Sequence, residues 1–259
     1  MPSAPVHPYW GILEITGFAI LFFTGNWLMG PFIANSLLLV LLFWVIIISG
    51  SFYLLWISPV KLHGIRWKEW GWNISLSDDN HPGSLNKALP TYLAVTVLVG
   101  TFFILYVILF TPETIGRINL KAVAVKFVGY LFFGTAQSII FFGFIMTRLK
   151  SATSRKFENA NPNLQLFSTV FLTAAIFSIF HHPNTPLMVI TFLGGLIWAW
   201  LFYEKPNILL MGVSHAIIGT ILSQVVQMHT RIGPFYNNPD HYFIREVVPG
   251  LKQLIGDLF

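Results

Sequence analysis

Two histidines lie in apolar stretches of the sequence, where an imidazole ring has no water to bind. His181 ends the stretch Phe177-Ser-Ile-Phe-His181, and His215 begins the stretch His215-Ala-Ile-Ile-Gly219. In hydrocarbon such a ring must be paired with another group or serve a function. A neutral imidazole can donate or accept a hydrogen bond, or bind a metal, a haem iron or the magnesium of a chlorophyll. These two histidines are therefore the first candidates for chemistry.

A third polar side chain, Gln137, lies in the apolar stretch Gly134-Thr-Ala-Gln137-Ser138. At a rise of ~1.5 Å per residue from the polar residues that flank each stretch, Gln137, His181 and His215 lie about 16, 24 and 12 Å deep. Buried polar groups on adjacent membrane helices tend to meet. The spacing therefore predicts one cluster of the three side chains near mid-membrane.

The elements that position these residues are membrane helices, as the composition indicates. Of 259 residues, 55% are hydrophobic and only 10% are charged, and the chain has 25 Phe and 9 Trp. This composition excludes a soluble globular protein. A span needs about 20 apolar residues, and the apolar stretches cover residues 10–30, 32–58, 88–110, 122–149, 166–181, 185–203 and 207–229. We expect an all-α, multi-pass transmembrane bundle of seven or eight spans in a lipid bilayer.

The pattern predicts three regions along the chain. Residues 1–120 form N-terminal membrane helices, with an interfacial segment at 60–87 in which Trp67, Trp70 and Trp72 place their indole rings at the headgroup level. Residues 121–229 form the membrane core, and residues 230–259 form a loop and an amphipathic tail. Glu14 and Asn26 lie within about a turn of the ends of the first stretch, so both are expected to reach the membrane interface.

The charges orient the chain in the membrane and exclude some functions. The formal net charge is +5, but the basic residues lack the clustered face that nucleic-acid binding needs. Loops on the side of the N-terminus, among which Arg148 is counted, hold nine Lys and Arg, against five on the other side. This asymmetry predicts a cytoplasmic N-terminus. Cysteine is absent, which excludes disulfides, thiolate metal sites and a cysteine nucleophile.

The order and spacing of these motifs resemble a known family. The stretch from Phe177 to His181 is similar to the FxxxH motif, and the stretch from His215 to Gly219 to the HxxxN motif, of the CAAX protease and bacteriocin-processing (CPBP) family of intramembrane peptidases. The segment 136–143 matches the family's EExxxR motif in position, and the resemblance covers about residues 121–227. It implies a CPBP-like core in which Gln137, His181 and His215 occupy catalytic positions, with Phe141, Phe177 and Gly219 beside a substrate.

The sequence departs from the family pattern at the residues that activate water. Ala136 and Gln137 stand where the two glutamates belong, Phe141 where the arginine belongs, and Gly219 where the asparagine belongs. A neutral amide cannot take a proton from water, and general-base assistance contributes a factor of about 10² to 10⁴ in rate. The loss of glutamate and arginine together leaves no unpaired charge. The pattern is typical of a site that has lost its acid–base chemistry.

Three functions remain open from the sequence. The favoured one is a degenerate peptidase that acts as a binding or assembly subunit with other membrane proteins or a hydrophobic peptide. The first alternative is an active CAAX-type intramembrane endopeptidase that uses another base, for which Glu14 and Glu204 are the candidates. The second alternative is a subunit that binds haem or chlorophyll through His181 or His215. The favoured function requires no cofactor, no metal site is predicted, and no nucleic acid is expected as a partner.

Overall fold

A computed structural model of the chain describes residues 8–29, 37–65, 67–73, 75, 81–156, 161–234 and 236–237. Within these ranges the regular elements are helices, and none is a β-strand. The prediction of an all-α fold is confirmed. Most of the loop and amphipathic tail expected at residues 230–259 lies outside the described residues.

Six helices of the described ranges are long and apolar enough to cross a membrane. They cover Leu41–Leu62, Leu85–Phe110, Leu120–Ser154, Pro162–Ile179, Thr185–Glu204 and Ile208–Val225. The first apolar stretch forms α1 (Pro8–Phe23) and the π-helical η1 (Thr24–Met29), which are not among the six. The protein is therefore an integral, multi-pass membrane protein, and the expected count of seven or eight spans is approximate.

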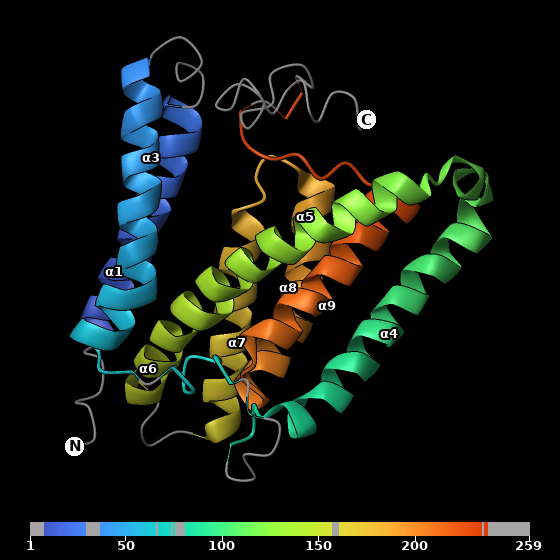
Figure 1. Cartoon of the computed structure of the whole chain (residues 1–259). Coiled ribbons are helices and arrows are strands. Elements are labelled where there is room, and N and C mark those ends of the chain that lie inside the picture. The colour runs from blue at the N-terminus through green and yellow to red at the C-terminus, as the bar shows by residue number, and fades with distance from the viewer. Residues whose placement is uncertain are drawn as a thin grey trace.

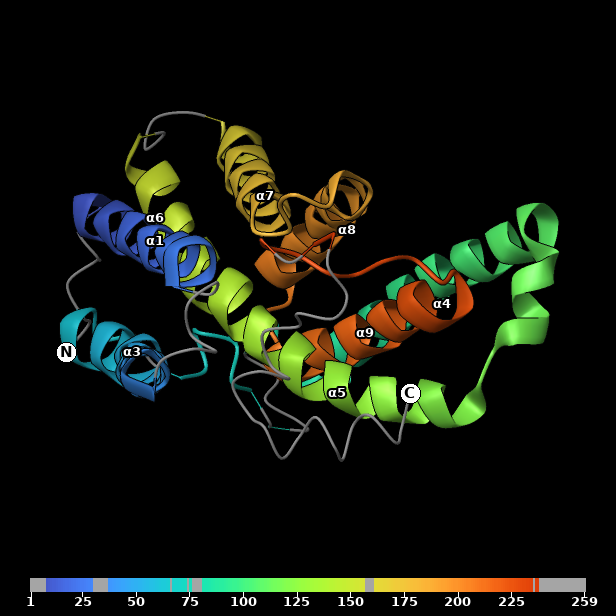
Figure 2. The same ribbon diagram turned by 90° about the horizontal axis from the view of Figure 1, so that it is seen from above.

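The N-terminal helices form a pair at one side of the bundle (Figures 1 and 2). Helix α3 (Leu37–Phe52) continues as the π-helical η2 (Tyr53–Leu62), whose Tyr53 and Ser58 donate hydrogen bonds to Glu14 of α1. Helix α1 packs on α6 (Thr147–Lys156), whereas α3 presents large apolar side chains such as Ile48, which is 65% exposed. Exposed apolar side chains on a membrane helix face lipid, which is as apolar as they are.

The longest helix crosses the whole bundle at a tilt (Figure 1). It consists of α5 (Leu120–Ser138), the π-helical η4 (Ile139–Met146) and α6. A helix over the 35 residues Leu120–Ser154 is about 52 Å long, so it must tilt or protrude from a hydrocarbon layer of about 30 Å. The π-helical segment begins directly after Ser138. Such segments within α-helices are frequent at functional sites.

Glycines bring α9 (Ile208–Thr220) close to α5. A Cβ atom on Gly212 would lie 2.2 Å from Oγ1 of Thr135, and one on Gly219 would lie 2.9 Å from Cδ1 of Tyr130. Small residues of this kind let membrane helices approach closely. Helix α4 (Leu85–Phe110) lies along the other side of α9 (Figure 2), and α9 ends in the π-helical η5 (Ile221–Val225).

Asparagines begin the helices α7 (Pro162–Ile179), α8 (Thr185–Glu204) and α9. The Oδ1 atoms of Asn161, Asn184 and Asn207 accept hydrogen bonds from backbone N–H groups of the first turns, as is typical of N-caps. Asn207 also donates to the carbonyl oxygens of Asn73 and Gly83 at 3.0 and 2.9 Å. These bonds fasten the end of the segment 60–87 to the start of α9.

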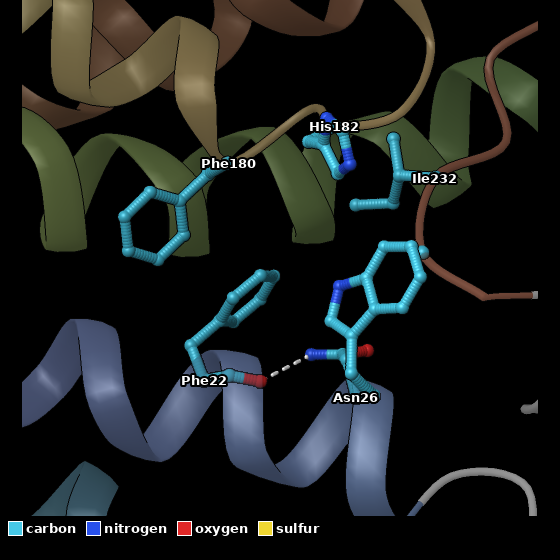
Figure 3. A pocket seen from close by; sticks show the side chains of 7 residues that line it. Phe22, Asn26, Phe180, His182 and Ile232 are labelled. Carbon is cyan, nitrogen blue, oxygen red and sulfur yellow. Dashed lines mark hydrogen bonds between the residues drawn. The ribbon is translucent and has the colours of Figure 1, made fainter.

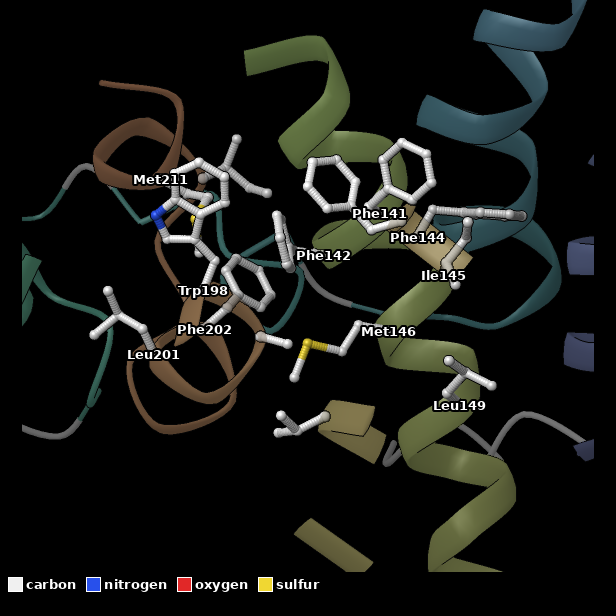
Figure 4. Close-up of a cluster of buried hydrophobic side chains, with 14 of the residues drawn as sticks. Phe141, Phe142, Phe144, Ile145, Met146, Leu149, Trp198, Leu201, Phe202 and Met211 are labelled. Carbon is white, nitrogen blue, oxygen red and sulfur yellow. The ribbon is translucent and has the colours of Figure 1, made fainter. Parts of the chain in front are cut away.

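The core of the bundle is rich in aromatic side chains (Figure 4). Phe141, Phe142 and Phe144 of η4 are at most 4% exposed. Trp70 joins this core at 1% exposure and contacts Gly143, so the expectation of an interfacial indole is wrong for this residue. Trp67, which is 40% exposed, agrees better with that expectation. The segment 60–87 thus both covers the core and reaches its surface.

Candidate functional site

His181 lies just beyond the end of α7, and its ring is 7% exposed. Its Nδ1 atom is 2.7 Å from the carbonyl oxygen of Phe177. Since a carbonyl oxygen can only accept, the proton of the neutral ring is on Nδ1. Nε2 is then the nitrogen with the free lone pair, which is the arrangement that a ligand or a proton acceptor requires.

His215 lies in α9, where Trp198 of α8 and Gly134 of α5 enclose its ring. Its ring, 7% exposed, stacks on Trp198 with ring centroids 4.9 Å apart and an interplanar angle of 21°. A Cβ atom on Gly134 of α5 would lie 3.0 Å from its Cγ. Its Nδ1 atom is buried and has no hydrogen-bond partner in the described part of the chain. The ring is held by packing rather than by hydrogen bonds.

Phe177 stands between the two histidines. Its ring centroid is 4.9 Å from that of His181 and 6.1 Å from that of His215, edge to face in both cases. Gln137 is half-buried on α5 and, within the described ranges, forms no hydrogen bond with either histidine. The structure brings the two rings together around Phe177, whereas the amide adds no bond to them.

Apolar groups fill two of the other motif positions. Phe141, at the position of the family's arginine, packs edge to face on Phe177 and Phe180 with centroids 4.9 and 5.1 Å apart. Gly219, at the position of the asparagine, is buried beneath the ring of Tyr130, whose Cδ1 would lie 2.9 Å from an added Cβ. A longer side chain at residue 219 has no room unless Tyr130 moves.

Ser214 has its own partners beside the histidine pair. Its Oγ atom accepts hydrogen bonds from Thr96 Oγ1 at 2.7 Å and from Trp198 Nε1 at 3.1 Å. The hydroxyl therefore joins α4, α8 and α9 through these side chains. This arrangement agrees with its place next to His215 in one helix, about 100° around the axis, which is poor geometry for a Ser-His pair.

A second polar cluster lies around Glu14, on the N-terminal side of the molecule. Oε1 of Glu14 accepts hydrogen bonds from Tyr53 Oη at 2.6 Å and Ser58 Oγ at 2.7 Å. Oε2 lies 3.1 Å from both His63 Nε2 and Arg148 Nε. The expectation that Glu14 reaches the interface is wrong, because its side chain is only 5% exposed. A carboxylate in an apolar environment needs such donors.

Arg148 is the cation of this cluster rather than a loop residue. It is 1% exposed, its Nη2 atom donates to Ser58 Oγ, and its guanidinium lies 4.2 Å from the ring centroid of Phe144. The sequence analysis placed Arg148 in a loop, because the stretch of residues 148–156 is basic, and so did not predict its pairing with Glu14. The signal that could have found it is the isolated carboxylate of Glu14, which requires a cation from another helix. Without Arg148, the Lys and Arg on the N-terminal side number eight.

The described residues offer few ligands for a metal. Among them, no group of three or more His, Asp or Glu side chains is placed to hold a metal ion. No described carboxylate bonds to His181 or His215. The chemistry that these two rings can provide here is hydrogen bonding, or ligation of a group by a single ring nitrogen.

The comparisons with known proteins agree with the motifs. Residues 119–221 match the family model described as Type II CAAX prenyl endopeptidase Rce1-like. The resemblance to the CAAX protease and bacteriocin-processing family is thus confirmed over this part of the chain, which includes α5, η4 and α6 to α9. No curated protein and no solved structure matches the chain.

Proposed function

We propose that this protein, with its CAAX-peptidase-like core at residues 119–221, binds a hydrophobic peptide or another membrane protein and does not cleave it. The fold of the core supports recognition of a membrane-embedded segment. The residues at the catalytic positions support the loss of hydrolysis. The protein then acts as a binding or assembly subunit in the membrane.

The observation that carries this proposal is the packing at Gly219. In the family that it resembles, this position holds an asparagine, which supports the oxyanion. Here the ring of Tyr130 fills the space that a side chain would need. Removing one oxyanion donor lowers a rate by about 10² to 10³. Phe141 adds an apolar wall where a cation would stand, so the site lacks both electrostatic elements.

An active peptidase needs a general base to take a proton from water, and the two candidate carboxylates, Glu14 and Glu204, are poorly suited to that role. Gln137 cannot accept a proton from water. Both oxygens of Glu14 accept hydrogen bonds, and one of them is paired with Arg148. Glu204 is exposed at the end of α8. A carboxylate already bound to a guanidinium and to hydroxyl groups is a weak acceptor for a further proton.

The test of the proposal is proteolysis in vesicles. The wild-type protein is reconstituted and incubated with a pool of prenylated and unmodified membrane peptides, together with the variants His181→Ala and His215→Ala. We expect no cleavage above that of empty vesicles, for any of the three proteins. Robust wild-type cleavage that disappears in both variants would contradict the proposal and establish the peptidase alternative.

Binding is tested in the same vesicles with peptides that carry a photoreactive group. We expect crosslinks to the core at residues 119–221, and weaker crosslinking in Phe177→Ala, which removes the ring between the two histidines. The absence of crosslinks in the wild-type protein would contradict the binding function. Absorption spectra of the purified protein test the remaining alternative, since haem and chlorophyll absorb visible light.

We also propose that the N-terminus lies in the cytoplasm. Eight Lys and Arg on the N-terminal side, once Arg148 is set aside, still exceed the five on the other side. Lys and Arg in short loops favour the cytoplasmic side of a membrane. The start of α7 then lies on the cytoplasmic side, and η3 (Pro112–Arg117) lies on the opposite side.

A further inference from the structure

An apolar groove lies between α1 and the end of α7. Its lining comes from Ile15, Thr16, Ala19, Ile20, Phe23 and Thr24 on one side and from Ile176, Ile179 and Phe180 on the other. Its volume is about 490 Å³, within the range of about 300 to 1,000 Å³ that is usual for small-molecule sites. Along α1, the groove extends over residues 15–24, or about 14 Å.

A shallow hollow lined in part by polar side chains lies beside Phe180 (Figure 3), and it has no room for a whole water molecule inside it. Phe180 also lines the groove, so the two are neighbours. The hollow adds Asn26, Trp27 and His182, with the rings of Trp27 and His182 5.6 Å apart. Asn26 donates to the carbonyl oxygen of Phe22 at 2.9 Å. Its Nδ2 is therefore in use, and its Oδ1 is left as an acceptor.

The hollow is complementary to a group rich in oxygen. Within the described ranges, the side chains of Trp27 and His182 form no hydrogen bond, which leaves an indole N–H and a ring N–H as donors. No carboxylate is among the lining residues. Phosphate and ester oxygens accept hydrogen bonds from such donors.

The two spaces also lie at the right depths for an amphipathic molecule. The polar hollow is at the helix ends, where η1 follows α1 and where the chain leaves α7. The apolar groove extends from there toward the membrane interior. Tryptophan at such a position is typical of the headgroup level. Lipid surrounds the protein, so an amphipathic molecule that could fill the groove and cover the rim of the hollow is abundant beside them.

We propose that a phospholipid binds between α1 and α7, with one acyl chain in the groove and its phosphate and ester oxygens over the outer rim of the hollow, at Trp27 and His182. The volume of the groove suits one hydrocarbon chain. Phe180 closes the inner wall, since its ring packs on Phe141 at 5.1 Å. The lipid therefore stays outside the histidine pair, and its binding is independent of the proposed function.

The experiment is photolabelling in vesicles. The full-length protein is reconstituted in phosphatidylcholine that contains a trace of phosphatidylcholine with a diazirine on one acyl chain. After irradiation, the labelled residues are mapped by mass spectrometry. We expect labelling of the groove residues of α1 and α7 to exceed that of exposed apolar residues on α4, such as Leu98 and Phe102, by about tenfold.

Variants separate a specific site from ordinary lipid contact. Ala19→Phe on α1 and Ile179→Trp on α7 fill the groove from opposite walls, and each should lower this labelling by about tenfold. Ala124→Phe, at an exposed position of α5, is the matched control and should change nothing. Trp27→Phe removes the indole donor and should weaken labelling, whereas Trp200→Phe at an exposed position of α8 should not.

Three results would overturn the proposal. The first is even labelling over all lipid-facing helices, which indicates lipid contact without a site. The second is groove labelling that neither Ala19→Phe nor Ile179→Trp reduces. The third is a groove shielded from lipid by a copurifying protein, which would assign this surface to a protein partner. None of these results depends on a proteolysis assay. A result that overturns the lipid site therefore leaves the proposed function unaffected.

Discussion

Glu14 of α1 and Arg148 of α6 form a buried ion pair, with Oε2 and Nε 3.1 Å apart and side-chain exposures of 5% and 0%. The pair joins residues 134 positions apart in the chain. Gly11, one turn before Glu14, allows this approach, because a Cβ there would lie 2.9 Å from Cγ of Arg148. The N-terminal helix pair is thus fastened to the family-like core through one carboxylate and one guanidinium.

Breaking this pair from one side should destabilise the protein more than removing both charges. Arg148→Met strands the carboxylate of Glu14 among apolar groups, at a cost of about 3 to 5 kcal/mol for a broken buried pair. The double variant Glu14→Leu with Arg148→Met leaves no buried charge and should recover part of that loss. Thermal unfolding of the purified proteins in mild detergent measures the difference.

The matched control for this series is Arg117→Met, which removes an exposed arginine of η3 and should leave the melting temperature unchanged. Glu14→Leu alone completes the series. If the double variant loses as much stability as Glu14→Leu and Arg148→Met added together, the ion pair has no coupling energy. Its role in holding α1 against α6 would then be refuted.

The sequence predicts the helices of this fold well, since long apolar stretches leave few alternatives in a membrane. The stretches at 88–110 and 185–203 agree with α4 and α8 to within a few residues. The basic stretch after Met146 was expected to end a span, but the helix continues to Lys156. Arg148 is therefore buried, and no local pattern shows this, because its partner comes from the other end of the chain.

The candidate site shows the same limit. The motif spacing predicts that His181 and His215 are buried, and both are. The ring of Phe177 between them could not be predicted, since an FxxxH pattern does not say which way the ring turns. The sequence shows that Gly219 replaces the asparagine of the motif. Only the structure shows that Tyr130 occupies the space that a side chain at residue 219 would need. Such packing depends on contacts between helices, not on the spacing within one.

Gly219→Ala should destabilise the contact between α5 and α9. The added Cβ would lie 2.9 Å from the ring of Tyr130, and overpacking typically costs about 1 to 3 kcal/mol. In a Tyr130→Leu background the ring is gone, so the same change should cost less. Melting temperatures of the four proteins form a double-mutant cycle.

Gly129→Ala is the control for this cycle, because a Cβ at Gly129 meets no other atom within 4 Å. Replacing glycine by alanine inside a helix stabilises it by about 0.5 to 1 kcal/mol, so this variant should melt no lower than the wild type. Equal effects of Gly219→Ala in both backgrounds would show that Tyr130 does not restrict residue 219.

The orientation in the membrane can be tested with single cysteines, since the chain has none of its own. Asn163 is exposed near the start of α7, and Glu113 is exposed in η3 on the opposite side. With a cytoplasmic N-terminus, an impermeant maleimide should label Glu113→Cys on intact cells and Asn163→Cys only after lysis. The reverse pattern would place the N-terminus outside.

The two histidines should respond differently to replacement by phenylalanine. His181→Phe removes the hydrogen bond from Nδ1 to the carbonyl oxygen of Phe177. Because such bonds in membranes average about 0.6 kcal/mol, this variant should lose about that much stability.

His215→Phe keeps a flat ring against Trp198 and Gly134 and removes a nitrogen, Nδ1, that has no partner in the described ranges. An unsatisfied buried polar atom costs about 1 to 3 kcal/mol, so this variant should be neutral or more stable. Its melting temperature and its visible absorption spectrum are the measurements, with Trp200→Phe as a control on α8. A large loss of stability, or the loss of a visible absorption band, would show that His215 binds a group through its ring, and the cofactor alternative would then replace the packing role that its neighbours indicate.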